Sequence, residues 1–376
     1  MARHWTINGR FLSQPTTGVQ RYAGEIVRSL DALIAEQAPL TRGLELRLHC
    51  PPGSSDIPLD SIERCEIGSR GGHLWEQTRL AASLHGGGLL SLCNTGPLLS
   101  RKHIVCIHDA NVWNAPQSYS LGFRTSYKAL LPCLGKTARS ISTVSNFSLG
   151  ELVRRGIVPK RRAFVAPNGH EHVLLWKPEH SAATRLAASR ETIVMIGSAA
   201  PHKNVNLILD MADRLGKAGL KIAVVGMSGS HVFKTGSARP EARNIHWLGR
   251  ISDSELAALL TDSLCLAFPS LTEGFGLPVV EAMALGCPVV VSERASLPEV
   301  CGNAALYAAA DNPQAWFDRF MGLRNSKALR LQLIGKGKAR ASAYSWRASA
   351  LRYLQAMALA DGIDTETEVV RLLELT

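Results

Sequence analysis

The sequence predicts an α/β protein with two domains, each built on a parallel sheet that helices cover on both faces. Three observations support this: the length of 376 residues, the apolar content of 46%, and an alternation of short apolar runs with helical patterns. A chain of this length is typical of about two domains, and its apolar residues are sufficient for two cores. Charged residues make up only 19% of the chain, which argues against disorder.

The expected strands are short runs that are apolar almost throughout, as in parallel strands buried on both faces. They cover residues 44–49, 89–93, 104–107 and 140–144 in the first half, and 192–196, 221–225, 264–268 and 288–291 in the second. Helices are expected between them, with residues 18–34 and 204–215 showing apolar side chains at helical spacing. This alternation of strand and helix predicts parallel sheets.

A domain boundary is expected near residues 172–190, where a proline-containing stretch leads into an Ala- and Ser-rich segment. We therefore expect a first domain over residues 1–175 and a second over residues 190–344. The eight cysteines form no C-x-x-C pair, so a zinc site is not expected. Scattered cysteines of this kind are typical of small buried side chains in a reducing compartment.

The net charge of +11 is concentrated in the first half, where residues 1–180 carry 21 Lys and Arg against 13 Asp and Glu. A basic half favours an anionic partner: a phosphorylated lipid, a membrane surface or nucleic acid. No nucleic-acid-binding motif is recognisable, so nucleic acid is not expected. The sequence has no apolar run of membrane-spanning length and no secretory signal, which predicts a cytoplasmic protein.

The strongest local signal covers residues 264–286 and predicts a strand, a turn and a helix. Gly274 and Gly276 let the backbone approach a ligand closely, while Pro278 suits the first helical turn and Gly286 its end. Ligands of open α/β sheets bind beyond the carboxyl ends of the strands, and the N–H groups at a helix start attract phosphate. We therefore expect a nucleotide or phosphate site here.

Two carboxylates and one cation complete the expected site. Glu273 precedes the helix and Glu281 lies within its first turns, where a carboxylate can accept hydrogen bonds from a ribose diol. A second strand, loop and helix over residues 193–204 places Lys203 for a diphosphate, with Asn204 as the expected N-cap. A lysine there would stabilise the negative charge that builds on a departing nucleotide diphosphate.

Glu273 and Glu281, with the flanking Glu-Gly-Phe-Gly-Leu-Pro and Glu-Ala-Met-Ala, resemble the E-x7-E motif of retaining family-4 glycosyltransferases of the GT-B fold. The resemblance implies two Rossmann-like domains that face each other across a cleft. It implies that Glu281 binds the nucleotide ribose and that Glu273 faces the donor sugar. The amides of Phe275, Gly276 and Leu277 are then expected to approach the sugar and the pyrophosphate.

Further segments extend the resemblance over most of the chain. Lys203 and His202 occupy the loop in which the family carries Arg and Lys, but Ser198 follows Gly197, so one usual arginine is missing or replaced. Residues 247–250 resemble the loop that touches the nucleobase, which assigns Arg250 to the donor. The donor-binding set implied by the resemblance therefore includes His202, Lys203 and Arg250.

The first domain is expected to contribute from across the cleft. Residues 8–22 resemble the family's first strand, loop and helix, with Gly18 where the backbone passes close to the donor diphosphate. His108 ends a strand at the position of a histidine that contacts the donor sugar near the reacting carbon, and Asp109 either orients it or faces the acceptor. A structural role is the alternative for His108. A C-terminal helix, about residues 345–376, is expected to cross back onto the first domain.

The resemblance implies a retaining glycosyltransferase that moves a sugar from a nucleotide diphosphate to a hydroxyl of a glycan or a lipid-linked glycan. Assembly of a bacterial surface polysaccharide, such as lipopolysaccharide, is the expected context, with GDP-mannose as the first candidate donor and UDP-sugars left open. The departing phosphate oxygen is expected to deprotonate the acceptor. No cofactor and no metal are expected, since no D-x-D motif stands in a suitable loop.

The basic first domain fits a lipid-diphosphate-linked acceptor, with peripheral contact at the inner face of the plasma membrane. Two other functions remain open. A nucleotide-sugar epimerase shares the two-domain architecture but would convert the donor without an acceptor. A carbohydrate-binding relative that has lost catalysis is the non-enzymatic alternative.

Overall fold

The computed structural model describes residues 2–69, 71–198, 200–226 and 242–363, and the chain divides into two compact units. Unit 1 contains Met1–Trp113, Ser120–Gly169 and Ser345–Thr376, and unit 2 contains Asn114–Tyr119 and His170–Tyr344. The chain passes from unit 1 to unit 2 after Gly169, slightly before the stretch expected from the sequence. Of the expected crossover segment, residues 364–376 lie outside the described part of the chain.

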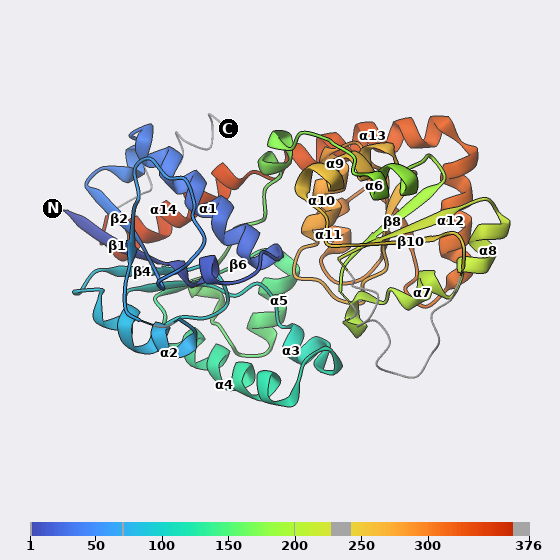
Figure 1. The fold of residues 1–376 in the computed structure, drawn as a ribbon. Helices are drawn as coiled ribbons and strands as arrows, with labels where there is room; N and C mark the ends of the chain where they lie inside the picture. Colours follow the sequence, from blue (N-terminus) through green and yellow to red (C-terminus); the bar gives the residue numbers. More distant parts are fainter. Residues whose placement is uncertain (1, 70, 199, 227–241, 364–376) are drawn as a thin grey trace. The chain divides into compact units, whose positions relative to one another are not determined.

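Unit 1 is built on a seven-stranded parallel sheet with the strand order β3-β2-β1-β4-β5-β6-β7 (Figure 1). The strands are β1 Arg3–Asn8, β2 Leu44–Cys50, β3 Glu63–Glu66, β4 Gly88–Ser91, β5 His103–Cys106, β6 Ser140–Thr143 and β7 Ala163–Val165. The order reverses between β1 and β4, as in a Rossmann fold. Such a reversal opens a crevice at the carboxyl ends of the two strands, where ligands bind.

The helices of unit 1 lie on both faces of this sheet. Figure 1 shows α1 and α14 on one face, and α2 and α4 on the other. The α-helices are α1 Gly18–Ala35, α2 His73–Trp75, α3 Asn111–Asn114, α4 Leu121–Thr137, α5 Asn146–Arg154 and α14 Trp346–Ala360. Shorter helical turns are η1 Gly9–Ser13, η2 Pro39–Thr41, η3 Glu76–Leu80 and η5 Lys160–Arg162.

Unit 2 repeats the same topology with six parallel strands in the order β10-β9-β8-β11-β12-β13. The strands are β8 Thr192–Ile196, β9 Lys221–Val225, β10 Ile245–Gly249, β11 Cys265–Phe268, β12 Val289–Ser292 and β13 Leu306–Ala308. Its helices and turns are η4 Pro116–Ser118, η6 Glu171–Leu175, α6 Ala182–Ala187, η7 Pro201–Lys203, α7 Asn206–Leu209, α8 Ala212–Lys217, α9 Asp253–Asp262, α10 Leu277–Ala284, α11 Leu297–Cys301, α12 Pro313–Asn325 and α13 Lys327–Ser342. The order reverses between β8 and β11, so unit 2 has its own switch point there.

The predicted fold class, two Rossmann-like α/β domains, is confirmed. All eight expected strands form within two residues of their expected bounds, whereas the apolar runs did not indicate β1, β3, β7, β10 and β13. The prediction of one helix over residues 204–215 is wrong in two respects. It is divided into α7 and α8, and Asn204 does not cap it but adopts a left-handed conformation with φ +52°.

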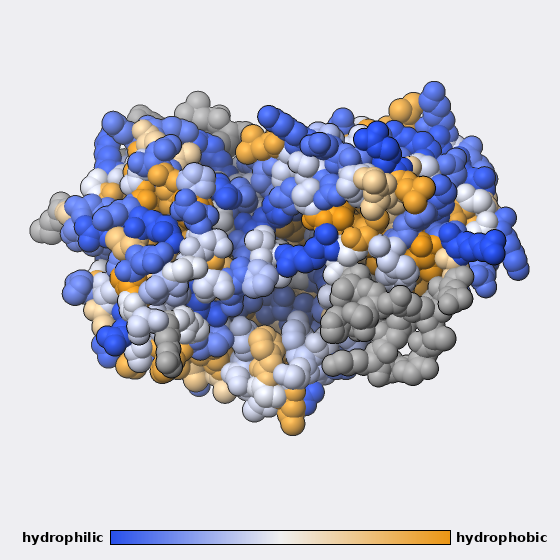
Figure 2. Space-filling view, in the orientation of Figure 1, coloured by the Kyte–Doolittle hydropathy of each residue, from blue (hydrophilic) through white to orange (hydrophobic). Residues whose placement is uncertain are grey.

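Each unit has its own apolar core. In unit 2, side chains of β8, β9 and β11 pack against α12, where Trp316 and Phe320 are fully buried. In unit 1, β5 and β6 pack against α4 and α5 through Val105, Ile141 and Leu134, among others. The face seen in Figure 2 is largely hydrophilic, with apolar side chains in small groups. Most of the apolar content is therefore used inside the two units.

The C-terminal helix α14 belongs to unit 1 and lies beside α1 (Figure 1). A buried hydrogen-bonded chain joins the two helices to the sheet: the Tyr353 hydroxyl lies 2.8 Å from that of Tyr22 and 2.6 Å from Oγ of Ser142. Ser349 Oγ donates to the carbonyl of Pro167 at 2.6 Å. Because these polar groups are buried, each depends on its partner for a hydrogen bond that water cannot supply.

Asp361, the residue after α14, accepts hydrogen bonds from three side chains of unit 1. Arg3 Nε lies 2.7 Å from Oδ2, Trp5 Nε1 lies 3.1 Å from the same atom, and Lys102 Nζ pairs with Oδ1. Burial acts to raise the pKa of Asp361, but the hydrogen bonds from Lys102, Arg3 and Trp5 outweigh it and lower the pKa. The side chains of Arg3 and Asp361 are both buried, so this ion pair is shielded from solvent.

We predict that Asp361→Ala destabilises the protein by roughly 3–5 kcal/mol, because the buried Arg3 guanidinium loses its counter-charge. The matched control is Arg347→Ala on the same helix, which removes the exposed ion pair with Glu36 and should cost less than about 1 kcal/mol. Urea unfolding of the two variants measures the difference. Equal destabilisation by both substitutions would show that the buried pair does not anchor this end of the chain.

Candidate active site

The loops that follow β8 and β11 bring a cation and a carboxylate together at the switch point of unit 2. Lys203 ends the turn η7 after β8, and Glu273 lies in the loop after β11. Lys203 Nζ is 2.7 Å from Glu273 Oε1, with side-chain exposures of 23% and 11%. The ammonium also lies 5.5 Å from the ring centroid of Phe268, the last residue of β11. Two of the predicted site residues are therefore in direct contact.

Asn204 holds these two loops together. Its side-chain Nδ2 donates to the carbonyl of Pro269 at 3.2 Å and to that of Ala310 at 2.8 Å. The backbone N–H of Leu271 donates to the carbonyl of His202 at 2.7 Å. The left-handed backbone at Asn204, which asparagine tolerates better than most residues, aims its amide at these carbonyls. This role replaces the N-cap role predicted from the sequence.

The glycine loop that leads into α10 has a backbone that only glycine fits. Gly276 has φ +101°, and a Cβ there would lie 2.9 Å from Leu297 Cδ2. Leu277 is the first residue of α10, Pro278 follows in its first turn, and Gly286 lies just beyond its end, as predicted. The backbone at Gly276 thus turns the loop directly into a helix N-terminus.

The hydroxyl of Ser296 holds the same loop in place, although nothing in the sequence indicated this role for Ser296. Its hydroxyl is buried and lies 3.1 Å from the carbonyl of Glu273 and 3.0 Å from that of Phe275. The Phe275 ring packs edge-on against Tyr344, with centroids 5.2 Å apart. The backbone that carries the Glu273 carboxylate is therefore held at both residues.

Glu281 lies on α10, one turn beyond the glycine loop, and is also buried. His172 Nε2 lies 3.0 Å from Glu281 Oε1, and both side chains are largely shielded from solvent. His172 belongs to η6, and its ring packs edge-on against Trp176 with centroids 5.4 Å apart. Sequence analysis missed His172 because it stands in no recognisable motif. The contact with Glu281 makes it part of the candidate site.

His202 and Arg250 occupy different positions in unit 2. His202 Nδ1 lies 2.8 Å from Ser118 Oγ, and the imidazole stacks on Tyr119 at a centroid distance of 6.3 Å. Burial and the neighbouring Lys203 lower the pKa of His202, against the opposing effect of Glu273. His202 is therefore neutral near pH 7 and adds hydrogen bonding rather than charge. Arg250 is exposed and follows β10, an edge strand separated from β8 by β9.

The predicted residues of the first domain lie at the carboxyl ends of strands in unit 1. His108 follows β5, and its Nε2 lies 2.8 Å from the carbonyl of Leu92. Its backbone N–H donates to Asn94 Oδ1 at 2.7 Å. Tyr22 of α1 packs edge-on against the His108 ring, with centroids 4.8 Å apart. His108 is thus held in one orientation by backbone and packing.

Asp109 and Gly18 complete this group. Asp109 Oδ1 accepts the backbone N–H of Asn111 at 2.8 Å, which starts α3. Gly18 is the first residue of α1, is exposed, and has open space where a Cβ would lie. The predicted site residues therefore form two groups, one in each unit, and each group follows the strands of its own sheet.

Two properties of the described residues bear on ligands and membranes. Within them, no three or more His, Cys, Asp and Glu side chains are arranged to hold a metal ion. None of the helices in residues 2–69, 71–198, 200–226 and 242–363 is both long and apolar enough to cross a bilayer.

Comparison with known proteins bears directly on the loops just described. Residues 177–340 match the family model of the group 1 glycosyl transferases. This segment contains both switch-point loops of unit 2, with Lys203, Glu273 and Glu281. The family model and the relatives named below support a group 1 glycosyltransferase.

Two similar relatives are described as mannosyltransferases. The chain is 26% identical over 268 residues to the O-antigen chain mannosyltransferase B of Escherichia coli, covering 65% of this chain and 66% of the relative. It is 26% identical over 229 residues to the O-antigen chain mannosyltransferase RfbU of Salmonella typhimurium, covering 59% of this chain and 61% of the relative. The chain thus spans less than two thirds of the length of either relative.

Solved structures of other proteins share the fold. Anabaena Alr3699/HepE in complex with UDP and glucose aligns with a TM-score of 0.70 and 14% identity, covering 95% of this chain and 100% of that one. WaaG, a glycosyltransferase of lipopolysaccharide biosynthesis, aligns with a TM-score of 0.66 and 13% identity, covering 94% of this chain and 99% of that one. At these identities the likeness concerns the fold, which is GT-B.

We predict that Ser296→Ala destabilises the protein by about 1–3 kcal/mol, because the buried carbonyls of Glu273 and Phe275 lose their hydroxyl partner. The control is Ser342→Ala, where an exposed hydroxyl donates to the carbonyl of Ala339 and water can replace it. Urea unfolding compares the two variants. If Ser296→Ala were as stable as Ser342→Ala, the loop would not depend on this hydroxyl.

Proposed function

We propose that this protein is a glycosyltransferase that moves a hexose, with mannose as the first candidate, from a nucleotide diphosphate to a hydroxyl of a glycan or a lipid-linked glycan. The observation that carries the proposal is the contact between Lys203 and Glu273 at the switch point of unit 2. Glu273 lies in the loop that contains Gly276 and leads into α10. Mannose is chosen because the relatives named above are mannosyltransferases. Assembly of a surface polysaccharide is the corresponding context.

The residues of unit 2 are assigned to the donor. Lys203 and the N-terminus of α10 offer positive charge and N–H groups to a diphosphate. The buried Glu281 carboxylate accepts hydrogen bonds from the hydroxyls of the ribose, and Glu273 faces the donor sugar. The amides of Phe275, Gly276 and Leu277 approach the sugar and the pyrophosphate. His202 supports the diphosphate loop, and Arg250 is assigned to the nucleobase side.

The transfer proposed here retains the configuration of the anomeric carbon. The bond between that carbon and the diphosphate oxygen breaks, and the acceptor oxygen forms its bond on the same face of the sugar. The proton of the acceptor hydroxyl passes to the departing phosphate oxygen, so no separate general base is required. Lys203 stabilises the negative charge left on the nucleotide diphosphate in place of a metal ion.

The residues of unit 1 are assigned to the reacting end of the donor and to the acceptor. His108 is proposed to contact the donor sugar near its reacting carbon, and its fixed orientation suits such a contact. Gly18 leaves open space at the start of α1 for a diphosphate, and Asp109 is placed on the acceptor side. These assignments rest on the resemblance and on the position of all three at strand or helix ends.

A lipid-linked acceptor and peripheral contact with an anionic membrane are part of the proposal. The densest basic stretch of unit 1, residues 154–162, is only partly available for this contact. Arg154 and Arg155 both pair with Glu151, and Arg162 donates to the carbonyls of Gly135 and Ala138 at the end of α4. The membrane contact therefore depends on the exposed Lys160 and Arg161 and on other cations of unit 1.

A thermal-shift screen against GDP-, UDP-, ADP- and dTDP-linked sugars tests the donor class, since a ligand that binds only the folded state raises its stability. We expect GDP-mannose to give the largest shift. Release of nucleotide diphosphate should then require an acceptor such as an alkyl mannoside, and NMR of the product should show retained configuration. Conversion of the donor without an acceptor would indicate an epimerase, and no shift with any nucleotide sugar would overturn the proposal.

We predict that Glu281→Ala weakens binding of the nucleotide diphosphate by about tenfold or more, because charge-assisted hydrogen bonds to the ribose are lost. His172→Ala should weaken binding through Glu281, so the double variant should bind no more weakly than Glu281→Ala alone. Glu191→Ala, an exposed carboxylate of unit 2, is the control. Calorimetry measures all four proteins, and additive losses in the double variant would contradict the positioning role of His172.

A further inference from the structure

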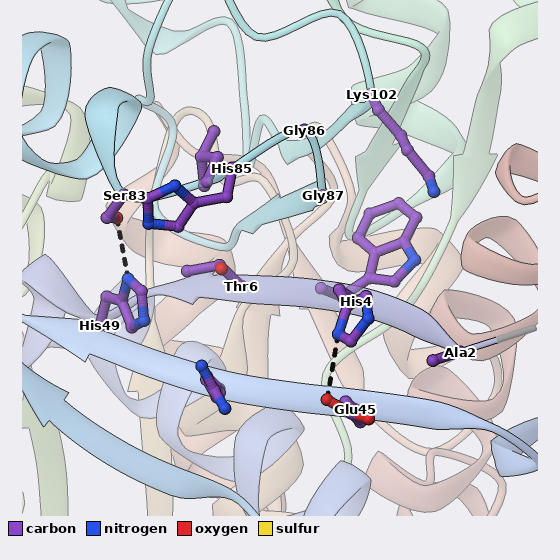
Figure 3. A pocket seen from close by; sticks show the side chains of 13 residues that line it. Ala2, His4, Thr6, Glu45, His49, Ser83, His85, Gly86, Gly87 and Lys102 are labelled. Carbon is purple, nitrogen blue, oxygen red and sulfur yellow. Dashed lines mark hydrogen bonds and ion pairs between the residues drawn. The ribbon is translucent and has the colours of Figure 1, made fainter.

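A hollow of about 500 Å³ lies over the first two strands of unit 1 (Figure 3). His4 and Thr6 of β1 and Glu45, Arg47 and His49 of β2 line it. The segment of residues 83–87 forms one rim, and Lys102 lies at its end (Figure 3). We call this hollow the β1–β2 pocket. It involves none of the residues assigned to the sugar transfer.

The pocket exists because β2 is open on one face. Its sequence, Leu-Glu-Leu-Arg-Leu-His-Cys, alternates between apolar and polar residues, and Leu44, Leu46 and Leu48 are the buried set. Parallel strands covered on both faces read as continuous apolar runs, whereas alternation is typical of a sheet face that reaches solvent. Glu45 and Arg47 are accordingly exposed in the middle of a sheet.

The polar groups of the pocket are mostly basic. Three histidines, one arginine and one lysine line it, against a single lining carboxylate, Glu45. Two carboxylates outside the lining pair with these cations, Asp361 with Lys102 and Glu63 with Arg47. His4 Nδ1 lies 3.0 Å from Glu45 Oε2, so that carboxylate already has a partner. Burial lowers the pKa of His49, and the nearby Arg47 and His85 lower it further, against the effect of Glu63. Arg47 and His85 therefore lie close enough to His49 to act on the same ligand.

Several of these groups have bonding capacity left for a ligand. His49 Nδ1 lies 2.9 Å from Ser83 Oγ, which leaves Nε2 of the ring (Figure 3). Arg47 Nε lies 3.1 Å from Glu63 Oε2, and the Arg47 side chain is exposed. Within the described part of the chain, the His85 ring and the Thr6 hydroxyl have no hydrogen-bond partner, although Thr6 is 7% exposed. These side chains can therefore donate hydrogen bonds to a ligand in the pocket.

We propose that the β1–β2 pocket binds a small sugar that carries an oxyanion, either a phosphate or a carboxylate. Arg47, His49 and His85 take the anion, since a guanidinium offers paired donors to such a group. Thr6 and Glu45 suit the hydroxyls of the sugar. The volume of the pocket is within the range of sites for small molecules. The pocket is a binding site separate from the donor site of unit 2.

Calorimetry on the full chain in a phosphate-free buffer tests this proposal. Glucose 6-phosphate and glucuronate carry the two oxyanions, while glucose and inorganic phosphate each supply one half of the ligand. We expect at least one anionic sugar to bind, and both glucose and inorganic phosphate to bind about tenfold more weakly. A preference between the two anionic sugars identifies the oxyanion.

Two substitutions and a control locate the binding. Arg47→Gln should weaken binding of the preferred anionic sugar by about tenfold. His85→Asn should also weaken it, and asparagine suits the left-handed backbone there, where φ is +45°. Arg28→Gln is the control, because Arg28 is likewise a surface arginine paired with one glutamate.

Three results would overturn the proposal. The first is that neither anionic sugar binds, or that glucose binds as tightly. The second is that inorganic phosphate binds as tightly as the preferred sugar, because the sugar would then contribute nothing. The third is an equal loss of affinity in Arg28→Gln and Arg47→Gln, which would mean general attraction to a basic surface.

Discussion

The contact between the loops after β8 and β11 determines where the charged groups of unit 2 meet. A lysine at the end of a surface turn is ordinarily mobile and well solvated. Here the turn is held by the Asn204 amide on the carbonyl of Pro269 and by the Leu271 N–H on the carbonyl of His202. Each such bond contributes on the order of 1 kcal/mol, and together they fix Lys203 beside Glu273. A diphosphate arriving at this point would find the cation already placed and would compete with the carboxylate for it.

The same topology places the candidate residues of unit 1. Both sheets reverse their strand order after the first strand, and both collect functional side chains where strands end. His108 is oriented by the segment after β4, through the carbonyl of Leu92 and the side-chain amide oxygen of Asn94. Lys203 is oriented by the segment after β11. In each unit a residue that follows one strand is therefore held by the segment that follows its neighbour, although the two units share no motif.

The sequence predicted those parts of the structure that depend on local pattern. Strands were recognisable because their apolar runs are short and nearly continuous, and α10 because glycine and proline mark its ends. Asn204 was misinterpreted because its amide bonds to carbonyls 65 and 106 residues away. His172 was missed for the same reason, since its partner Glu281 is 109 residues away. Residues 44–49 were predicted to form a strand buried on both faces. The alternation of apolar and polar residues in this segment, which was visible in the sequence, instead indicated one exposed face.

Unit 1 is discontinuous, and this has a consequence for its synthesis. The strands of its sheet are complete by residue 165, but α14 and Asp361 emerge only after the whole of unit 2. At a translation rate of about 5–20 residues per second, that interval is roughly 10–40 s. During it, Arg3 lacks its carboxylate and Tyr22 lacks the hydroxyl of Tyr353. On the ribosome unit 2 is therefore the first to complete its tertiary structure. Until α14 is made, one sheet face of unit 1 is covered by α1 without its partner helix, and the exposed apolar surface can bind chaperones.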